Sequence, residues 1–403
     1  MNRRLCVAPV MGLALLLVTA SVATAAEQTD KRFAGPWNLD ELKKTPAASW
    51  GEQSGQVREV YYKGEPLDGK PTRVFAYYAR PESGDGPFPG MVLVHGGGGT
   101  AFTEWATLWA KRGYAAIAMD LGGCGPQRKR LSDGMPAQGH PEKFREFSTE
   151  EEARLLWTYH AVAAVIRGHS LLAARDEVDA RRTGLTGISW GGYLTCIVAG
   201  IDDRFQVAVP VYGCGFLHEN SCWLGEFARL GPQQSRRWVA HFDPSRYLPG
   251  VRCPILFVNG TNDFAYPLDS YQKSYRCVPG PVDVRIQVRM PHGHPQGWAP
   301  REIGLYVDSV LTGGDPLPKL GAIETAHGKA TASFTAKVSV TQGHLHFTTG
   351  TGPWKTRKWE SVEAKLADGT VSAQLPAERP VVCYLSITDE RNAMVSTEHV
   401  ELP

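Results

Sequence analysis

The sequence TGLTGISWGGY at residues 183–193 decides how this chain is expected to fold. Its first six residues form a short uncharged run that predicts a strand, and the mostly apolar run at 192–199 predicts a helix. Between them, residues 187–191 fit the pattern G-x-S-x-G, in which a serine occupies a tight strand-to-helix turn. In such a turn the hydroxyl projects from the edge of a sheet. We therefore predict that Ser189 is a nucleophile.

Strand-like runs, of which those at 91–94, 115–119, 205–211 and 254–259 contain no charged residue, alternate with helical segments on both sides of this turn. Uncharged strands that alternate with helices imply a mostly parallel, doubly wound sheet covered on both faces, which is an α/β fold. The predicted strands are residues 57–62, 72–78, 91–94, 115–119, 205–211, 254–259 and 284–290, and the predicted helices are 103–112, 149–167 and 297–311.

The serine needs two further groups, because a hydroxyl is a weak nucleophile until a base removes its proton. In folds with this serine turn, the acid and the histidine follow at later strand ends. Asp263 comes just after the strand at 254–259 and is predicted as the acid, with Asp269 as the fallback. The next strand is followed by two histidines. We predict His294 as the base, because it follows a glycine and precedes the turn into the last helix; His292 is the alternative.

Acyl transfer also needs N–H donors for the charge that develops on the carbonyl oxygen. The backbone N–H of Trp190, next after the serine, is one predicted donor. The second is expected from the glycine run after the strand at 91–94, from Gly97 or Gly98. This run lacks the Gly-Lys-Ser/Thr of a Walker-type phosphate loop, which disfavours a nucleotide site.

The first residues have the pattern of an export signal. Arg3 and Arg4 precede an apolar run at 5–18, and small residues follow at 23–25. This run is shorter than the about 20 residues that a bilayer span requires. A cleaved signal peptide at 1–25 is predicted, with the periplasm or the extracellular space as destination.

The rest of the chain is divided by its patterning. We predict an irregular N-terminal arm at 26–56, a catalytic domain at 57–314 and a small C-terminal β-sandwich at 321–403. Two long segments interrupt the strand–helix alternation, and loops of this length are usually functional or disordered. Residues 122–147 are expected near the site, and 213–247 are expected to cap it.

Composition excludes several classes of partner. The formal net charge is +2, from 43 basic and 41 acidic residues, so no electrostatic footprint for nucleic acid or for an anionic membrane is present. Two histidines two residues apart, without a third ligand nearby, make a weak metal motif, and no metal or organic cofactor is required.

Cys214 and Cys222 are a plausible local disulfide. Four tryptophans could line a sugar-binding cleft or pack in the core: Trp105, Trp190, Trp223 and Trp298.

Residues 178–193 resemble the serine-turn region of bacterial acetyl xylan esterases, dienelactone hydrolases and prolyl-oligopeptidase-like hydrolases. The segments 260–263 and 292–294 are similar to the acid and base segments of those families. The resemblance covers 57–311 and implies an α/β-hydrolase fold with Ser189, Asp263 and His294 as a triad. Acetyl xylan esterases often have Gly-Tyr after the strand-end histidine, where this chain has Gly-Gly, and small cytosolic dienelactone hydrolases use cysteine.

Three functions follow as hypotheses. The first is an exported carboxylesterase that removes acetyl-type acyl groups from a carbohydrate. The second is a serine peptidase of the prolyl-oligopeptidase type, although no propeller-like repeats precede the first strand. The third is a non-catalytic binding protein with a degenerate hydrolase fold, which the complete set of serine, acid and histidine argues against.

Overall fold

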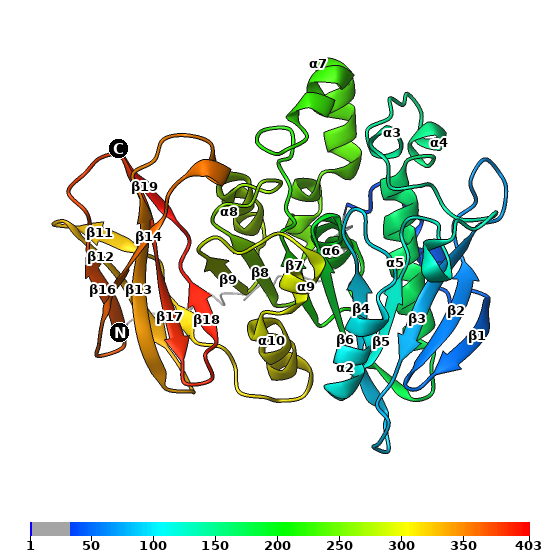
Figure 1. Ribbon diagram of the computed structural model, residues 1–403, viewed down its shortest axis with the longest axis horizontal. Coiled ribbons are helices and arrows are strands. Elements are labelled where there is room, and N and C mark those ends of the chain that lie inside the picture. The colour runs from blue at the N-terminus through cyan, green and yellow to red at the C-terminus, as the bar shows by residue number, and fades with distance from the viewer. Residues whose placement is uncertain (2–32) are drawn as a thin grey trace. The chain divides into compact units, whose positions relative to one another are not determined.

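The computed structural model describes Met1 and residues 33–403, so the predicted signal peptide lies outside the described residues apart from Met1. The main feature is a nine-stranded sheet in the order β1-β2-β3-β5-β4-β6-β7-β8-β9 (Figure 1). Its strands are β1 (Ala48–Ser54), β2 (Val57–Lys63), β3 (Arg73–Ala79), β4 (Phe88–Val94), β5 (Ala115–Met119), β6 (Val178–Ile188), β7 (Val207–Val211), β8 (Ile255–Gly260) and β9 (Val282–Gln287).

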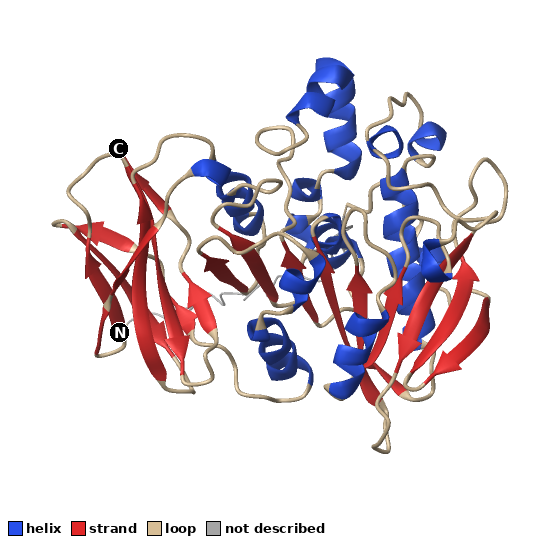
Figure 2. Ribbon diagram, in the orientation of Figure 1, coloured by secondary structure: helices blue, strands red, loops and turns tan. Residues whose placement is uncertain are grey.

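The sheet has an antiparallel edge and a parallel centre. Strands β1, β2, β3 and β5 pair antiparallel in succession, whereas β5, β4, β6, β7, β8 and β9 are parallel neighbours. Helices cover both faces, with α2 and α10 on one face and α5 and α6 on the other (Figures 1 and 2). The predicted α/β fold class is confirmed. The longer helices are α2 (Thr103–Lys111), α5 (Trp157–Ala173), α6 (Trp190–Ile201), α7 (Leu224–Phe242), α8 (Leu268–Arg276) and α10 (Arg301–Leu311).

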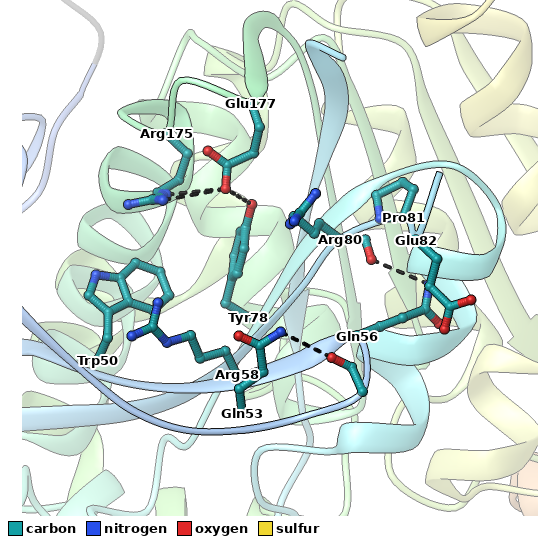
Figure 3. A pocket seen from close by; sticks show the side chains of 11 residues that line it. Trp50, Gln53, Gln56, Arg58, Tyr78, Arg80, Pro81, Glu82, Arg175 and Glu177 are labelled. Atoms are coloured by element: carbon teal, nitrogen blue, oxygen red, sulfur yellow. Dashed lines mark hydrogen bonds and ion pairs between the residues drawn. The ribbon is translucent and has the colours of Figure 1, made fainter. Parts of the chain in front are cut away.

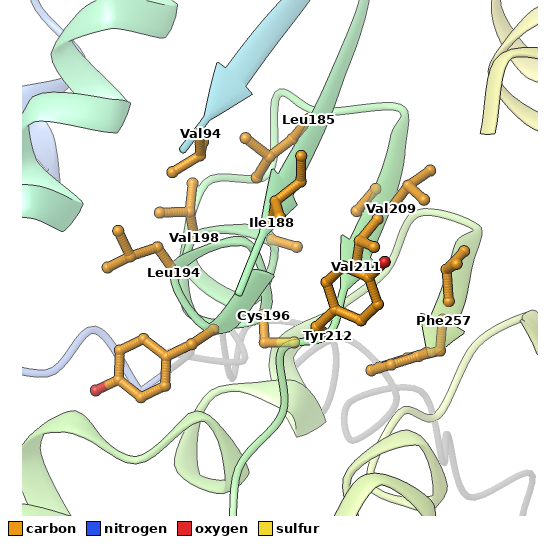
Figure 4. Close-up of a cluster of buried hydrophobic side chains, with 14 of the residues drawn as sticks. Val94, Leu185, Ile188, Leu194, Cys196, Val198, Val209, Val211, Tyr212 and Phe257 are labelled. Atoms are coloured by element: carbon orange, nitrogen blue, oxygen red, sulfur yellow. The ribbon is translucent and has the colours of Figure 1, made fainter. Parts of the chain in front are cut away.

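A dry apolar layer lies beneath the serine turn. Side chains of β6, β7 and α6 interlock there, and Leu185, Ile188, Leu194, Val198 and Val209 are at most 1% exposed (Figure 4). Burial of an aliphatic side chain of this kind contributes about 1.5–3 kcal/mol. The packing therefore holds the end of β6 and the start of α6 in one geometry.

The predicted irregular arm is wrong in part. Residues Leu39–Leu42 form the short helix α1, and β1 pairs with β2 at the edge of the large sheet. Six of the seven residues of β1 are exposed and none is buried. Such an edge strand lacks the alternation of apolar and polar residues by which a half-buried strand is found in a sequence.

Two predicted helices are each split in two. The segment 149–167 contains α4 (Glu150–Ala153), which begins with a capping box between Thr149 and Glu152, and then α5. The last segment contains α9 (His294–Trp298) and α10, which starts after Pro300. Proline has no N–H to donate, so a helix begins at it more readily than it passes through it.

The C-terminal region consists of two antiparallel sheets that pack against each other through β12, β13, β16 and β17. It is attached to β9, where Ile286 N–H donates to Ser396 Oγ at 2.9 Å and the Tyr384 hydroxyl donates to Ile286 O at 3.2 Å. Its strands are β10 (Lys319–Leu320), β11 (Glu324–Ala326), β12 (Lys329–Thr335), β13 (Val340–Thr348), β14 (Glu360–Glu363), β15 (Lys365–Ala367), β16 (Thr370–Gln374), β17 (Val381–Asp389), β18 (Met394–Ser396) and β19 (Val400–Leu402).

Two further observations concern expectations from the sequence. Cys214 and Cys222 are not bridged, so the suggested disulfide is absent from the structure. Among the described residues, no helix combines the length and the apolar character needed to cross a bilayer.

Candidate active site

Ser189 occupies a strained turn between β6 and α6. Its backbone has φ 59° and ψ −120°, a conformation that costs about 1–3 kcal/mol for a residue with a side chain. Ser189 N–H donates to Val211 O at 2.8 Å, which ties the turn to β7. A Cβ on Gly187 would lie 2.2 Å from Gly191 O, and one on Gly191 would lie 1.9 Å from Val94 O. Both glycines are required because the backbones approach too closely for any side chain.

A chain of hydrogen bonds leads from Ser189 through His292 to Asp263. Ser189 Oγ lies 2.9 Å from His292 Nε2, and His292 Nδ1 lies 2.7 Å from Asp263 Oδ2. A carboxylate only accepts hydrogen bonds, so Nδ1–H donates to Asp263 and leaves Nε2 to accept the serine hydroxyl proton. This arrangement prepares the hydroxyl to lose its proton to the imidazole.

Asp263 is held rigidly at the end of β8. It is 2% exposed, and its second oxygen, Oδ1, accepts from Ala265 N–H at 2.9 Å and from Tyr266 N–H at 2.8 Å. Hydrogen bonds to an ionised acceptor are stronger than neutral ones and offset the cost of burying the charge. The fallback residue, Asp269, lies elsewhere and accepts from Asn220.

The structure corrects the prediction that His294 contacts Ser189. His294 Nε2 accepts from Gly96 N–H at 3.0 Å, whereas His292, the alternative, reaches Ser189. Strand β9 ends at Gln287, earlier than predicted, and a turn at 288–291 brings His292 to the serine. His294 is instead the first residue of α9 and faces the glycine loop.

His294 is neutral near pH 7. Burial, with help from the neighbouring His95 and His292, lowers the pKa of His294 to about 4. A neutral ring with Nε2 as acceptor is the form that the Gly96 N–H requires. A Cβ on Gly96 would lie 2.8 Å from Ser189 Cβ, so His294 braces the segment of the loop that packs directly on the serine.

Gly97 and Gly98, the two glycines predicted as possible oxyanion donors, differ in the hydrogen bonds that their N–H groups make. Gly98 N–H donates to Gln138 Oε1 at 3.2 Å, whereas Gly97 N–H has no hydrogen-bond acceptor within residues 33–403. Gly97 packs on the indole of Trp190, since a Cβ there would lie 3.0 Å from Trp190 Cδ1. The Trp190 N–H, at the first position of α6, has no intrahelical acceptor. Gly97 and Trp190 thus offer two N–H groups beside Ser189.

Aromatic rings enclose the site. Tyr212 stacks on His292 with ring centroids 4.6 Å apart, and Trp223 lies 4.6 Å from Trp190. Trp105 instead stacks on Trp298 at 5.4 Å. The four tryptophans therefore form two separate pairs and not one cleft.

The loop at 122–147 contributes residues that sequence reasoning missed. Gln138 accepts a hydrogen bond from the glycine loop. Lys143 Nζ lies 4.7 Å from the ring centroid of Trp157 and 4.8 Å from that of Trp190. Burial lowers the pKa of Lys143 to about 8. A lysine buried between two indoles has no signature in the sequence, because the rings come from distant segments. The expected position of this loop near the site is confirmed.

A separate cavity of 590 Å³ lies at the antiparallel edge of the large sheet and shares no lining residue with this site. Arg58 and Arg175 both stack on the ring of Trp50, and Tyr78 donates to Glu177 at 2.8 Å (Figure 3). Among its charged residues, Arg175 pairs with Glu177 at 3.4 Å.

The fold, the serine turn and the comparisons agree on a class of fold: the chain has an α/β-hydrolase fold. Within it, the family model described as acetyl xylan esterase matches residues 39–221, which include Ser189 but neither Asp263 nor His292.

Similar proteins include two solved structures. An acetyl xylan esterase from Paenibacillus sp. R4 is 23% identical, with a TM-score of 0.56 over 68% of this chain and 92% of that one. Acetyl xylan esterase 1 from Thermoanaerobacterium sp. JW/SL YS485 is 18% identical, with a TM-score of 0.53 over 68% and 96%. Acetyl esterase Axe7A from Xylanibacter ruminicola is 22% identical over 274 residues, and the match spans 62% of this chain and 60% of that protein.

Proposed function

We propose that this protein is an exported serine esterase that removes acetyl-type acyl groups from a carbohydrate. The observation that carries the proposal is the chain of hydrogen bonds from Ser189 through His292 to Asp263. The match to the acetyl xylan esterase family model supports an ester substrate. The signal-like sequence at 1–25 supports export.

The reaction proceeds in two halves. Ser189 Oγ attacks the ester carbonyl while His292 Nε2 accepts the hydroxyl proton, and Asp263 keeps the imidazole in the required tautomer. The charged carbonyl oxygen binds the N–H groups of Trp190 and Gly97. His292 then gives its proton to the alcohol oxygen as the C–O bond breaks.

Water completes the cycle. It attacks the acyl group on Ser189 while His292 again accepts a proton, and the acid is released as Ser189 recovers its hydrogen. The two halves thus consume one water molecule and use only Ser189, His292, Asp263 and backbone N–H groups of this chain. The imidazole is both base and acid, so the alcohol part of the ester must lie next to His292.

The proposal is tested with p-nitrophenyl acetate and with a fluorophosphonate probe. We expect the wild-type protein to hydrolyse the ester and to be labelled at Ser189, and we expect Ser189→Ala to do neither. A panel of acetylated xylan, feruloylated sugars and a proline-containing peptide then separates esterase from peptidase. Hydrolysis of the peptide but of none of the esters would overturn the proposal.

A further inference from the structure

A cavity of 440 Å³ lies beside His292, on the boundary between the large sheet and the C-terminal region. The segments 262–264 and 289–292 line one side of it, and residues 355–357 line the other. We call it the η4 cavity, after the short helix η4 (Trp354–Thr356) of the C-terminal region. His292 and Asp263 are part of its lining, so the cavity adjoins two of the three hydrogen-bonded residues of the candidate site.

The η4 segment is docked firmly at this place. Asn262 Nδ2 donates to Arg357 O at 2.8 Å and lies 3.3 Å from the carbonyl oxygens of both Trp354 and Lys355. Asn262 immediately precedes Asp263. The C-terminal region is thus anchored one residue from the carboxylate that orients His292, and the η4 side of the cavity is a built wall.

Three cations line the cavity, and one of them, Arg357, interacts at longer range with the carboxylates of Glu401 and Asp269. Arg289, Lys355 and Arg357 line it, and within residues 33–403 none of them forms an ion pair with a carboxylate. Arg357 stacks on Trp354 at 3.8 Å, and its Nη1 is buried without a hydrogen-bond partner. The only carboxylate in the lining is Asp263, whose two oxygens are already engaged.

The positions of the acyl oxygen and of the leaving alcohol in the proposed reaction indicate which part of a substrate lies near these cations. The acyl oxygen lies on the side of Trp190 and Gly97, whereas the leaving alcohol lies beside His292, which protonates it. The η4 cavity is on the His292 side. An unpaired guanidinium and an ammonium group in a partly enclosed site favour an anion, since charge-assisted hydrogen bonds are the strong ones.

We propose that the η4 cavity binds an anionic group on the sugar part of the ester, a uronate-type carboxylate or a sulfate. This inference rests on the proposed esterase function and names its substrate class: acylated acidic glycans. The C-terminal region then selects the substrate, because two of the three cations belong to it.

The experiment compares acetylated xylo-oligosaccharides that are neutral, that carry a uronic acid, or that carry a sulfate. We expect kcat/KM to be about 10-fold higher for at least one of the two acidic substrates, through a lower KM, since one charged hydrogen bond is worth about that factor. In the double variant Arg289→Gln/Lys355→Gln, the ratio of acidic to neutral kcat/KM should fall to about 1. Use of the ratio cancels any general loss of activity.

The matched control is Lys329→Gln/Lys365→Gln, which removes two charges from exposed positions on β12 and β15. It should keep the preference for the acidic substrate. An equal effect of both double variants would mean that net charge alone sets the preference, and this would overturn the proposal. Equal wild-type kcat/KM on all three substrates would overturn it as well.

Binding provides a readout that does not require turnover. Deacetylated uronate-bearing and sulfated oligosaccharides are titrated calorimetrically into Ser189→Ala, with and without Arg289→Gln/Lys355→Gln. Tighter binding of an acidic than of a neutral oligosaccharide, lost in the triple variant, supports the inference. Equal binding contradicts it even if esters are hydrolysed. Absence of any ester hydrolysis would instead refute the esterase proposal and leave this test to decide on the cavity.

Discussion

At the scale of single residues, His292 and His294 have different hydrogen-bond partners although they are only two positions apart in the chain. His292 contacts Ser189 and Asp263, and His294 accepts from Gly96. A glutamine at 294 keeps a carbonyl oxygen that can accept the same N–H, whereas an alanine at 292 has no group that can accept a proton from Ser189.

We therefore expect His292→Ala to lower kcat on p-nitrophenyl acetate by about 10³-fold or more, as loss of a catalytic base does in this mechanism. His294→Gln should lower it by about 10-fold or less, because the glycine loop is still braced. Steady-state kinetics of the two variants measure this. A larger loss in His294→Gln than in His292→Ala would contradict the assignment of roles.

Ser189 has a strained backbone conformation, with φ 59° and ψ −120°. We expect Ser189→Ala to reduce kcat by about 10³-fold or more while the midpoint of urea unfolding changes little, since the alanine adopts the same turn. A parallel measurement of activity and unfolding checks both parts. Residual activity near the wild-type level would place the nucleophile elsewhere.

At the scale of elements, the serine turn depends on the close approach of β4, β6 and α6. A Cβ on Gly191 would lie 1.9 Å from Val94 O, which forces the backbone of one element to move. We expect Gly191→Ala to lower the free energy of unfolding by about 3 kcal/mol or more, as overpacking against backbone does.

The matched control is Gly225→Ala on α7, where a Cβ would meet nothing within 4 Å. There alanine should be neutral or stabilise by up to about 1 kcal/mol, because glycine is a poor helix former. Urea unfolding followed by circular dichroism compares the two variants. Equal stability of both proteins would show that the turn tolerates a side chain.

At the scale of the whole molecule, several histidines are buried without charge. Burial lowers the pKa values of His95, His160, His294 and His346 to about 4. The unfolded chain takes up protons on these rings below about pH 6.5, and the folded chain takes them up only near pH 4. The unfolded state then binds more protons, so stability rises with pH in this window and is lost as the pH falls.

We expect the free energy of unfolding to drop between pH 7 and pH 5 by at most about 1–2 kcal/mol for each of these histidines. Urea titrations at pH 5, 6 and 7 measure the slope. His160→Gln should flatten it, because one group with a lowered pKa is removed. A stability that stays constant over this window would contradict the account.

The sequence by itself determined the fold class and the position of the serine turn. Both follow from local patterns: apolar runs of strand length, helical periodicity and glycines at 187 and 191, which are properties of neighbouring residues. Asp263, which contacts His292 in the structure, was predicted as the acid for the same reason, since it closely follows an apolar strand. The exposed strand β1 was missed because nothing in it is buried.

Only the tertiary structure shows that His292 and not His294 contacts Ser189, and that Gly98 N–H but not Gly97 N–H has an acceptor within residues 33–403. The first difference depends on where a turn directs each histidine side chain. The second depends on a distant segment, since Gln138 accepts the hydrogen bond of Gly98 N–H. The η4 cavity likewise brings together residues about 65 positions apart in the chain, from Arg289 to Lys355. Distances of this kind arise from the packing of whole elements, which no local pattern encodes.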